Sequence, residues 1–179
     1  MEDKLKNKSV LFIDLDGTLI NTSTGNTYPK GIWDMQFKFD VLNKIHKWVY
    51  VSSGKLMYLI IVSNQGGIEL GIVDEQSFKS KMYYIRDAIF DYIGLPLETF
   101  SIVGCYCVTN NKQSDMRKPN TGLLVKGLED LGISDKFTKE EMFMVGDASG
   151  LKDQFSDSDK KTAENFGIDY FDVSEFVTL

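Results

Sequence analysis

The stretch SVLFIDLDGT, residues 9–18, decides the fold. Its first half, residues 9–13, is a short apolar run that stops at Asp14, and a second aspartate, Asp16, follows two positions later. A short apolar run bounded by polar residues is typical of a strand buried in a parallel sheet. The stretch therefore predicts a buried strand whose carboxyl end carries two carboxylates.

Segments of the same kind continue outward along the chain. Further buried strands are expected at residues 56–62, 99–108, 142–145 and 168–171. Helices are expected at residues 39–50, 74–93, 122–131 and 158–166. A stretch rich in Thr, Asn, Gly and Pro, residues 21–31, predicts a loop or a small flap. Strands that alternate with helices predict an α/β fold, in which helices flank both faces of a parallel sheet.

The composition of the 179 residues is that of an ordinary globular protein, with 42% hydrophobic and 26% charged side chains. This length suits one hydrophobic core, so residues 1–179 are expected to form a single domain. The formal net charge of −6 argues against the broad basic face that binds duplex nucleic acid. It does not argue against a local basic pocket for a strand end.

Targeting and redox signals indicate a soluble protein inside the cell. The first eight residues are polar and charged, unlike a secretory leader, and the longest apolar run, residues 56–62, is too short to span a membrane. Two cysteines, Cys105 and Cys107, stand one residue apart, which suits a reducing compartment and no disulfide framework. We expect an intracellular protein without membrane association, with nucleus and cytoplasm both open.

Polar side chains follow three of the predicted strands. They are Asp14 with Asp16, Ser63 with Asn64, and Gly146 with Asp147. The carboxyl ends of parallel strands share one edge of the sheet, where ligands of such folds bind. Carboxylates gathered there repel one another unless a cation neutralises them, and oxygen ligands suit Mg²⁺. With Lys118 as a charge for phosphate oxygens, the pattern predicts metal-assisted phosphoryl transfer.

Four segments in this order resemble the motifs of the haloacid dehalogenase (HAD) superfamily. They are Asp14-Leu15-Asp16-Gly17-Thr18, then Ser63, then Lys118, and then Gly146-Asp147 with Asp159. The match spans residues 9–169, and four motifs in register are far more specific than the first motif alone. The resemblance implies a Rossmann-like HAD fold and an Mg²⁺-dependent phosphatase.

The resemblance also implies a role for each residue. Asp14 would attack phosphorus and hold the phosphoryl group, Asp16 would protonate the leaving oxygen and later activate water, and Lys118 would neutralise phosphoryl charge. The expected Mg²⁺ ligands are Asp14, Asp16 through its backbone carbonyl, and Asp147. The expected substrate contacts are Thr18, Ser63, Asn64 and Arg117. Asp159 would support the site by positioning water, metal or Lys118.

Longer stretches around the motifs look like the phosphatase domain of the polynucleotide kinase 3′-phosphatases. They comprise residues 63–68, 117–122, 145–150 and 153–159, together with Trp33 and residues 174–176. Enzymes of that family clean 3′-phosphate ends at DNA strand breaks, so the resemblance implies nucleic-acid 3′ ends as substrate and indicates no obligate protein partner. A kinase domain is not expected, because residues 53–56 lack the first Gly and the final hydroxyl of a phosphate-cradling loop.

Histidinol-phosphate and heptose-bisphosphate phosphatases share the Ser-Asn-Gln and Arg-Lys-Pro stretches and form the alternative. They usually carry a zinc loop of three cysteines and a histidine before the lysine. Here only Cys105 and Cys107 stand in that region, while the one histidine, His46, lies far upstream. Two ligands cannot make a structural zinc site, which favours the DNA-end interpretation. A binding module without activity is not expected, because Asp14 and Asp16 are both present.

Only small insertions separate the motifs, so we expect a minimal or absent cap over the site. An uncapped site admits the end of a macromolecule, and we expect a narrow groove beside residues 21–28 that takes a single-stranded 3′ end. The candidate phosphate contacts are Lys30, Lys112 and Arg117. The candidate base-stacking groups are Tyr28 and Trp33, with a place in the core as the equal alternative for Trp33.

Overall fold

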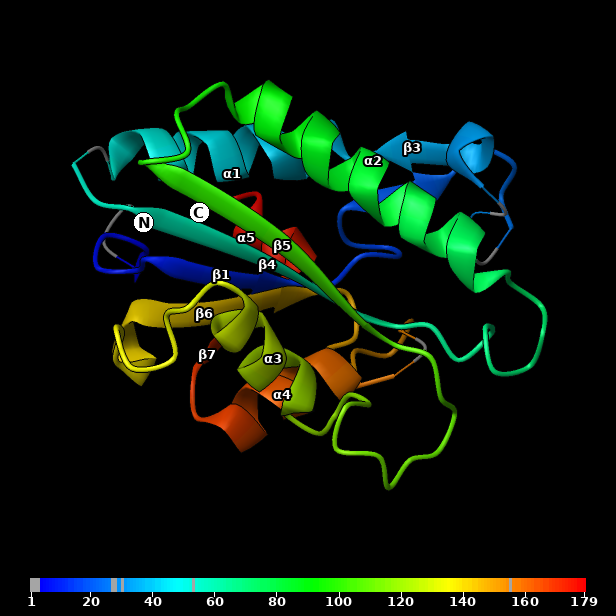
Figure 1. Cartoon of the computed structure of the whole chain (residues 1–179). Coiled ribbons are helices and arrows are strands. Elements are labelled where there is room, and N and C mark those ends of the chain that lie inside the picture. The colour runs from blue at the N-terminus through cyan, green and yellow to red at the C-terminus, as the bar shows by residue number, and fades with distance from the viewer. Residues whose placement is uncertain (1–3, 27–28, 30, 53, 155) are drawn as a thin grey trace.

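A computed structural model describes residues 4–26, 29, 31–52, 54–154 and 156–179. Its centre is a sheet of five parallel strands in the order β5-β4-β1-β6-β7 (Figure 1). The strands are β1 (Val10–Ile13), β4 (Met57–Asn64), β5 (Phe100–Cys107), β6 (Met142–Gly146) and β7 (Asp169–Asp172). The prediction of a parallel sheet in an α/β fold is confirmed.

Helices cover both faces of this sheet (Figure 1). One face packs against α1 (Phe39–Val51), α2 (Glu75–Ile93) and α5 (Val173–Phe176), and the other against α3 (Gly122–Asp130) and α4 (Ser158–Phe166). The short α5 was not predicted, whereas the other four helices lie where the sequence pattern places them. Among the described residues, none of the helices is both long and apolar enough to cross a membrane.

The buried residues of β1 are divided between the two faces. Leu11 and Ile13 pack toward α1, α2 and α5, whereas Val10 and Phe12 pack toward α3 and α4. Successive side chains of a strand point to opposite faces, so a strand covered on both faces is apolar throughout. All four side chains are fully buried, which explains the uninterrupted apolar run in the sequence.

Local signals in the sequence set the two ends of α2. The Asp74 carboxylate accepts a hydrogen bond from the Ser77 backbone N–H at 2.7 Å, and Gly94 ends the helix with a left-handed φ of 66°. The buried face carries the expected apolar stripe of Phe78, Met82, Ile85, Ile89 and Ile93. One charged residue, Lys81, is also buried on this helix.

Between β1 and α1 the chain forms a hairpin that the sequence analysis did not predict. β2 (Ile20–Thr22) pairs antiparallel with β3 (Met35–Phe37), so the loop expected at residues 21–31 begins inside a strand. Each strand has only three residues, too few for an alternating pattern to be recognised. The hairpin therefore owes its pairing to the surrounding fold and not to a local sequence signal.

Trp33 lies in a short 3₁₀ turn, Ile32–Asp34, just before β3. Its side chain is 72% exposed, so the alternative that Trp33 belongs to the core is wrong. The neighbouring Asp34 is fully buried and accepts hydrogen bonds from Ser23 and Thr24 across the hairpin. The buried carboxylate thereby closes the hairpin while Trp33 stays in solvent.

Candidate active site

Three strands bring the candidate residues to one edge of the sheet. β1 pairs in parallel with β4 on one side and with β6 on the other, so Ile13 stands level with Ile61 and Val145. Asp14 follows β1 and Asp147 follows β6, which places both at the carboxyl ends. The chain runs from β1 to β4 and β5, then crosses to β6 on the far side of β1. Such a reversal of strand order opens the crevice in which ligands of parallel sheets bind.

Lys118 connects two carboxylates at this edge. It is only 4% exposed, and its ammonium lies 2.5 Å from Asp14 Oδ1 and 2.7 Å from Asp159 Oδ1. It also donates to the Val62 carbonyl at 3.1 Å. Burial alone would lower the pKa of Lys118, but the two carboxylates outweigh it and hold that pKa above its ordinary value. Lys118 therefore faces Asp14 as an ammonium ion.

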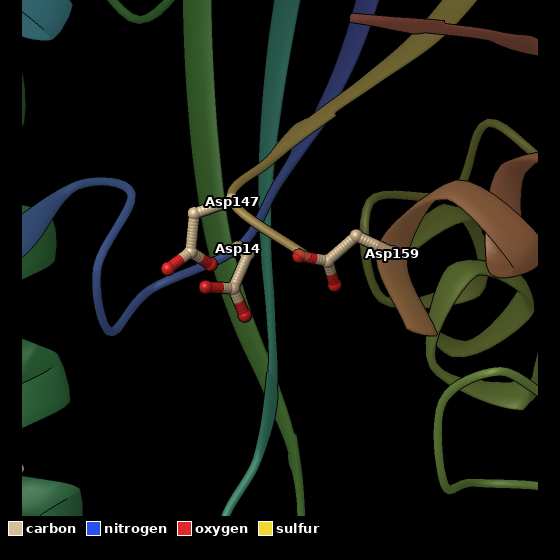
Figure 2. Close-up of side chains that lie close together, drawn as sticks. All are labelled: Asp14, Asp147 and Asp159. Carbon is tan, nitrogen blue, oxygen red and sulfur yellow. The ribbon is translucent and has the colours of Figure 1, made fainter. Parts of the chain in front are cut away.

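The surroundings of Asp14 disfavour its ionised form. Burial, together with the negative charges of Asp159 and Asp147, raises the pKa of Asp14 to about 8 against the opposing charge of Lys118. Burial, with Asp159 next, also raises the pKa of Asp147. Figure 2 shows the three carboxylates gathered together, and one oxygen of each lies within 4.8 Å of the others. Further positive charge beside these three carboxyl groups would therefore stabilise their ionised forms.

These side chains fit a divalent cation such as Mg²⁺, which takes carboxylate oxygens and keeps part of its water. Asp14 and Asp147 are the residues that could hold it. Asp159 is already engaged, because Lys118 donates to its Oδ1 at 2.7 Å and the Ala148 backbone N–H donates to its Oδ2 at 3.2 Å. Of the three roles expected for Asp159, the geometry matches the positioning of Lys118.

Two glycines let these carboxylates approach the backbone. Gly17 has a φ of +88°, a conformation that favours glycine, and a Cβ atom there would overlap Oδ2 of Asp147. A Cβ atom at Gly146 would overlap Oδ2 of Asp159. Each glycine therefore leaves the space that a carboxylate of the cluster occupies, which explains its place in the first and last motifs.

Asp16 is held by neighbours that the sequence analysis did not single out. Gln65 donates from Nε2 to Asp16 Oδ2 at 2.7 Å and to Ser63 Oγ at 2.8 Å, so it ties these two side chains together. On the other side of the carboxylate, the Lys81 ammonium lies 4.0 Å from Asp16 Oδ1. The available sequence signals were the position of Gln65 just after the Ser63 motif and a lysine within the apolar stripe of α2.

Two of the four expected substrate contacts hold other site residues in this structure. The Asn64 side chain accepts the Lys118 backbone N–H at 2.9 Å and donates to the Lys118 carbonyl at 3.0 Å. Thr18 is fully buried, and its hydroxyl lies 3.4 Å from Asp147 Oδ1. In this geometry Asn64 contacts the backbone of Lys118 and Thr18 contacts Asp147, and the substrate contacts expected for both residues stay predictions.

The other two expected contacts, Ser63 and Arg117, differ in exposure. Ser63 is 2% exposed and accepts a hydrogen bond from Gln65, so it belongs to the interior of the site. Arg117 is half-buried and donates to the Thr109 carbonyl at 2.9 Å. The remaining candidates are Lys112, which is exposed, and Lys30 and Tyr28, which lie outside the described residues.

A cavity of about 280 Å³ opens between the first motif and the hairpin. Asp16 and Gly17 form one side of its lining. The hairpin side consists of Ile20, Asn21, Thr22, Asn26 and Pro29. The groove expected beside residues 21–28 thus has a counterpart in the structure, and its lining combines a carboxylate with amide and hydroxyl groups.

Residues 9–177 match the family model described as polynucleotide kinase 3 phosphatase, which is almost the whole chain. The chain belongs to this family. It is thus a phosphatase of the HAD superfamily, and the resemblance carried by the four motifs is confirmed. The match begins one residue before β1 and ends one residue after α5, so it includes every strand and helix of the parallel-sheet unit.

Curated proteins similar to the phosphatase fall into several groups. A 20.8 kDa protein of Autographa californica nuclear polyhedrosis virus, described as uncharacterised, is 29% identical over 100% of this chain and 91% of its own length. The bifunctional polynucleotide phosphatase/kinase of Schizosaccharomyces pombe is 31% identical over 96% of this chain. The histidine biosynthesis bifunctional protein HisB of Legionella pneumophila is 28% identical over 94%. The chain spans only 38% and 42% of the last two relatives.

A solved structure with the same fold is D,D-heptose 1,7-bisphosphate phosphatase from B. bronchiseptica, complexed with magnesium and phosphate. It matches with a TM-score of 0.59 at 15% identity, over 95% of this chain and 96% of its own. This likeness concerns the fold. Because the similar proteins include a polynucleotide phosphatase/kinase and a sugar-bisphosphate phosphatase, membership of the family does not by itself name the substrate.

Proposed function

We propose that this phosphatase removes the 3′-phosphate from DNA strand ends, with Mg²⁺ as cofactor and an aspartyl-phosphate on Asp14 as intermediate. The observation that carries the chemistry is the buried pair of Asp14 and Lys118, 2.5 Å apart, with Asp147 beside it. The polynucleotide substrate is supported by the family match along residues 9–177. Residues 1–179 would act as one phosphatase unit.

In the first step, Asp14 attacks phosphorus. A bond forms between its carboxylate oxygen and phosphorus while the bond from phosphorus to the leaving 3′-oxygen breaks. Asp16 gives its proton to that oxygen, which leaves as a hydroxyl group. Lys118 and Ser63 offset the negative charge on the phosphoryl oxygens. Asp14 and Asp147 would hold Mg²⁺, which supplies further charge neutralisation when bound.

In the second step, water replaces Asp14 on phosphorus. Asp16, now a carboxylate, takes a proton from the water as the water oxygen bonds to phosphorus and the bond to Asp14 breaks. Inorganic phosphate leaves, Asp14 is a carboxylate again, and Asp16 has regained its proton. Gln65 supports both steps, because it holds Asp16 at 2.7 Å and Ser63 at 2.8 Å.

The hairpin and its cavity suit a strand end as the leaving group. The cavity beside Asp16 is lined by Asn21, Thr22 and Asn26, whose amide and hydroxyl groups match sugar and phosphate oxygens. Trp33, 72% exposed on the same hairpin, offers a ring face on which a base can stack. We therefore place the terminal nucleotides of the substrate along this hairpin.

The test is phosphate release with Mg²⁺ from a matched set of substrates. The set contains an oligonucleotide with a 3′-phosphate, the same oligonucleotide with a 5′-phosphate, histidinol phosphate and heptose bisphosphate. We expect kcat/KM to be highest for the 3′-phosphate by at least about tenfold. Asp14→Asn should release no phosphate from any of them. Faster turnover of a small molecule would replace this proposal by the second candidate.

The second candidate is a small-molecule phosphatase of the histidinol-phosphate or heptose-bisphosphate type. The 28% identity to HisB of L. pneumophila and the fold shared with the heptose-bisphosphate phosphatase favour it. The zinc-loop argument from the sequence counts against it. Cys105 and Cys107 are buried in β5, and His46 lies on α1, a different element.

A further inference from the structure

Lys81 is a charged residue in a position where α2 is otherwise apolar. It is 5% exposed and lies between Phe78 and Met82 of the buried stripe, with its ammonium 5.0 Å from the centre of the Phe78 ring. Removing an ammonium from water costs free energy unless a counter-charge or hydrogen bonds compensate. Burial accordingly lowers the pKa of Lys81, and Asp16 opposes that shift.

Asp16 is the carboxylate that faces this ammonium. Their ion pair, Nζ to Oδ1 at 4.0 Å, is the one that Lys81 makes among the described residues. Oδ1 of Asp16 is itself buried and has no hydrogen-bond partner in the described part of the chain. Its other oxygen, Oδ2, accepts the hydrogen bond from Gln65 at 2.7 Å. The carboxylate therefore lies between an amide donor on one side and a buried cation on the other.

The neighbouring cations are committed to different groups. Lys118 lies against Asp14 and Asp159, at 2.5 and 2.7 Å. Lys38 donates to the Gly17 carbonyl at 3.0 Å. Among the described residues this leaves Lys81 as the cation that faces Asp16.

We propose that Lys81 is a positioning residue for proton transfer. Together with Gln65, Lys81 holds the Asp16 carboxyl group in the orientation from which Asp16 protonates the leaving oxygen. The inference rests on the proposed role of Asp16 and not on the choice of a polynucleotide substrate. Lys81 acts through Asp16 and does not itself touch the substrate. Without the ammonium, Asp16 Oδ1 loses its counter-charge, and the carboxyl group is free to turn away from the leaving oxygen.

The need for a proton depends on the leaving group, and this dependence gives the test. As the bond from phosphorus to oxygen breaks, an alkoxide requires the proton of Asp16, whereas p-nitrophenolate leaves without it. A residue that positions Asp16 should therefore matter for alkyl phosphates and hardly matter for p-nitrophenyl phosphate. A residue that only supports the fold should matter equally for both.

The experiment measures kcat/KM of wild type and Lys81→Met with Mg²⁺ on a series of monoesters from alkyl phosphates to p-nitrophenyl phosphate. We expect a loss of about 30- to 100-fold for the alkyl esters and less than about fivefold for p-nitrophenyl phosphate. Lys81→Arg, which keeps the charge, should recover most of the alkyl activity. Lys79→Met is the matched control, because Lys79 lies on the same helix and pairs with Glu75 at 3.1 Å, and it should leave the series unchanged.

Three further variants keep the outcome decisive. Asp16→Asn should show the same dependence on leaving group, and adding Lys81→Met to Asp16→Asn should cause no further loss. If Lys81→Met does not fold, as judged by circular dichroism, Lys81→Gln, which removes the charge but keeps a polar side chain, takes its place in the same series. An equal loss on all esters, or a full further loss in the double variant, would overturn the inference. An oligonucleotide 3′-phosphate completes the series as a further alkyl ester, and a wild-type protein inactive on it and on every small ester would instead overturn the proposed function.

Discussion

The candidate functional side chains differ in exposure between two neighbouring regions. They are buried at the sheet edge of β1 and β6 and exposed on the β2–β3 hairpin beside it. At the edge, Asp14, Lys118 and Asp159 are at most 7% exposed, and Lys118 donates hydrogen bonds to both carboxylates. On the hairpin, Asn21 is exposed, and Trp33 is 72% exposed. The buried groups are in place before a substrate arrives, whereas the exposed groups gain partners only when it binds.

This difference separates the chemistry from the choice of substrate. In the proposed mechanism, Asp14, Lys118 and Asp159 serve the phosphoryl group, which every substrate has in common. The hairpin residues can contact only a substrate that extends beyond its phosphate. A change at Asp14, Lys118 or Asp159 should therefore slow all substrates alike, while a change at the exposed hairpin residues should affect long substrates selectively.

The largest effect is expected at the nucleophile. Asp14→Asn replaces the attacking carboxylate by an amide, so we expect kcat to fall by about 10⁴-fold or more on an oligonucleotide 3′-phosphate and on p-nitrophenyl phosphate alike. Phosphate release measures it, and Asp91→Asn, an exposed position on α2, serves as the control. Substantial activity remaining on either substrate would remove Asp14 from its proposed role.

A smaller loss of activity, again on all substrates, is expected when the packing behind the sheet edge changes. Gly146→Ala would press a methyl group against Asp159 and displace Lys118 with it. We expect a loss of about 1–3 kcal/mol in the free energy of unfolding and about 100-fold in kcat on all substrates. Urea unfolding and phosphate release measure the two effects.

The control for this change is Gly132→Ala, a glycine outside the site. Gly132 has a positive φ, +65°, unlike Gly146, and open space surrounds the position of its Cβ. The substitution should cost about 1 kcal/mol of stability from backbone strain and leave kcat unchanged. If Gly146→Ala retained full kcat, the tight packing of Asp159 would have no part in the chemistry.

The raised pKa of Asp14 predicts that Mg²⁺ affinity depends on pH. Burial raises this pKa from 3.8 to about 8 in the metal-free protein, so below pH 8 the cation must displace a proton. We expect the dissociation constant of Mg²⁺ to fall by up to about tenfold per pH unit between about pH 6 and pH 8, and then to level off. Calorimetric titration of protein stripped with EDTA measures it.

The same pKa sets the sign of a stability effect in the metal-free protein. A carboxyl group whose pKa is raised on folding stabilises the fold at low pH, and this contribution is lost as pH rises from 3.8 through about 8. Mg²⁺ should therefore raise the melting temperature more at pH 8 than at pH 6, and Asp14→Asn should remove the difference. An equal Mg²⁺ effect at both pH values in wild type would contradict the account.

The smallest effect, and the most selective, is expected on the hairpin. Trp33→Ala should raise KM for an oligonucleotide 3′-phosphate about five- to tenfold, because stacking of one base on an aromatic ring contributes about 1–3 kcal/mol. KM for p-nitrophenyl phosphate should stay the same. Leu97→Ala, which changes an apolar side chain 68% exposed before β5, is the control. An equal rise in KM for both substrates would contradict the proposed difference between the sheet edge and the hairpin.

The buried framework of the site was the part most open to prediction from the sequence. A strand covered on both faces must be apolar throughout, so β1 and β6 appear as uninterrupted apolar runs. Asp14 and Asp147 directly follow these runs, and parallel strands end at a common edge. Their proximity therefore follows from the fold class without knowledge of any side-chain contact.

Features that depend on contacts distant in sequence were not predictable in the same way. The three-residue strands β2 and β3 show no period of their own. The burial of Lys81 has its reason in Asp16, which lies on another element. Asn64 was expected to contact substrate, but its amide is bound by both backbone groups of Lys118, a partner that no local pattern reveals.

The most direct test of the central claim is to trap the phosphoryl group on the enzyme. Wild type and Asp16→Asn are mixed with p-nitrophenyl phosphate and Mg²⁺ and quenched with acid during turnover, and their peptides are examined by mass spectrometry. The account predicts a phosphoryl group on Asp14 that hydroxylamine removes, in larger amount in Asp16→Asn because the second step is slower there. Release of phosphate with Asp14 unmodified throughout, or with the phosphoryl group on another residue, would contradict it.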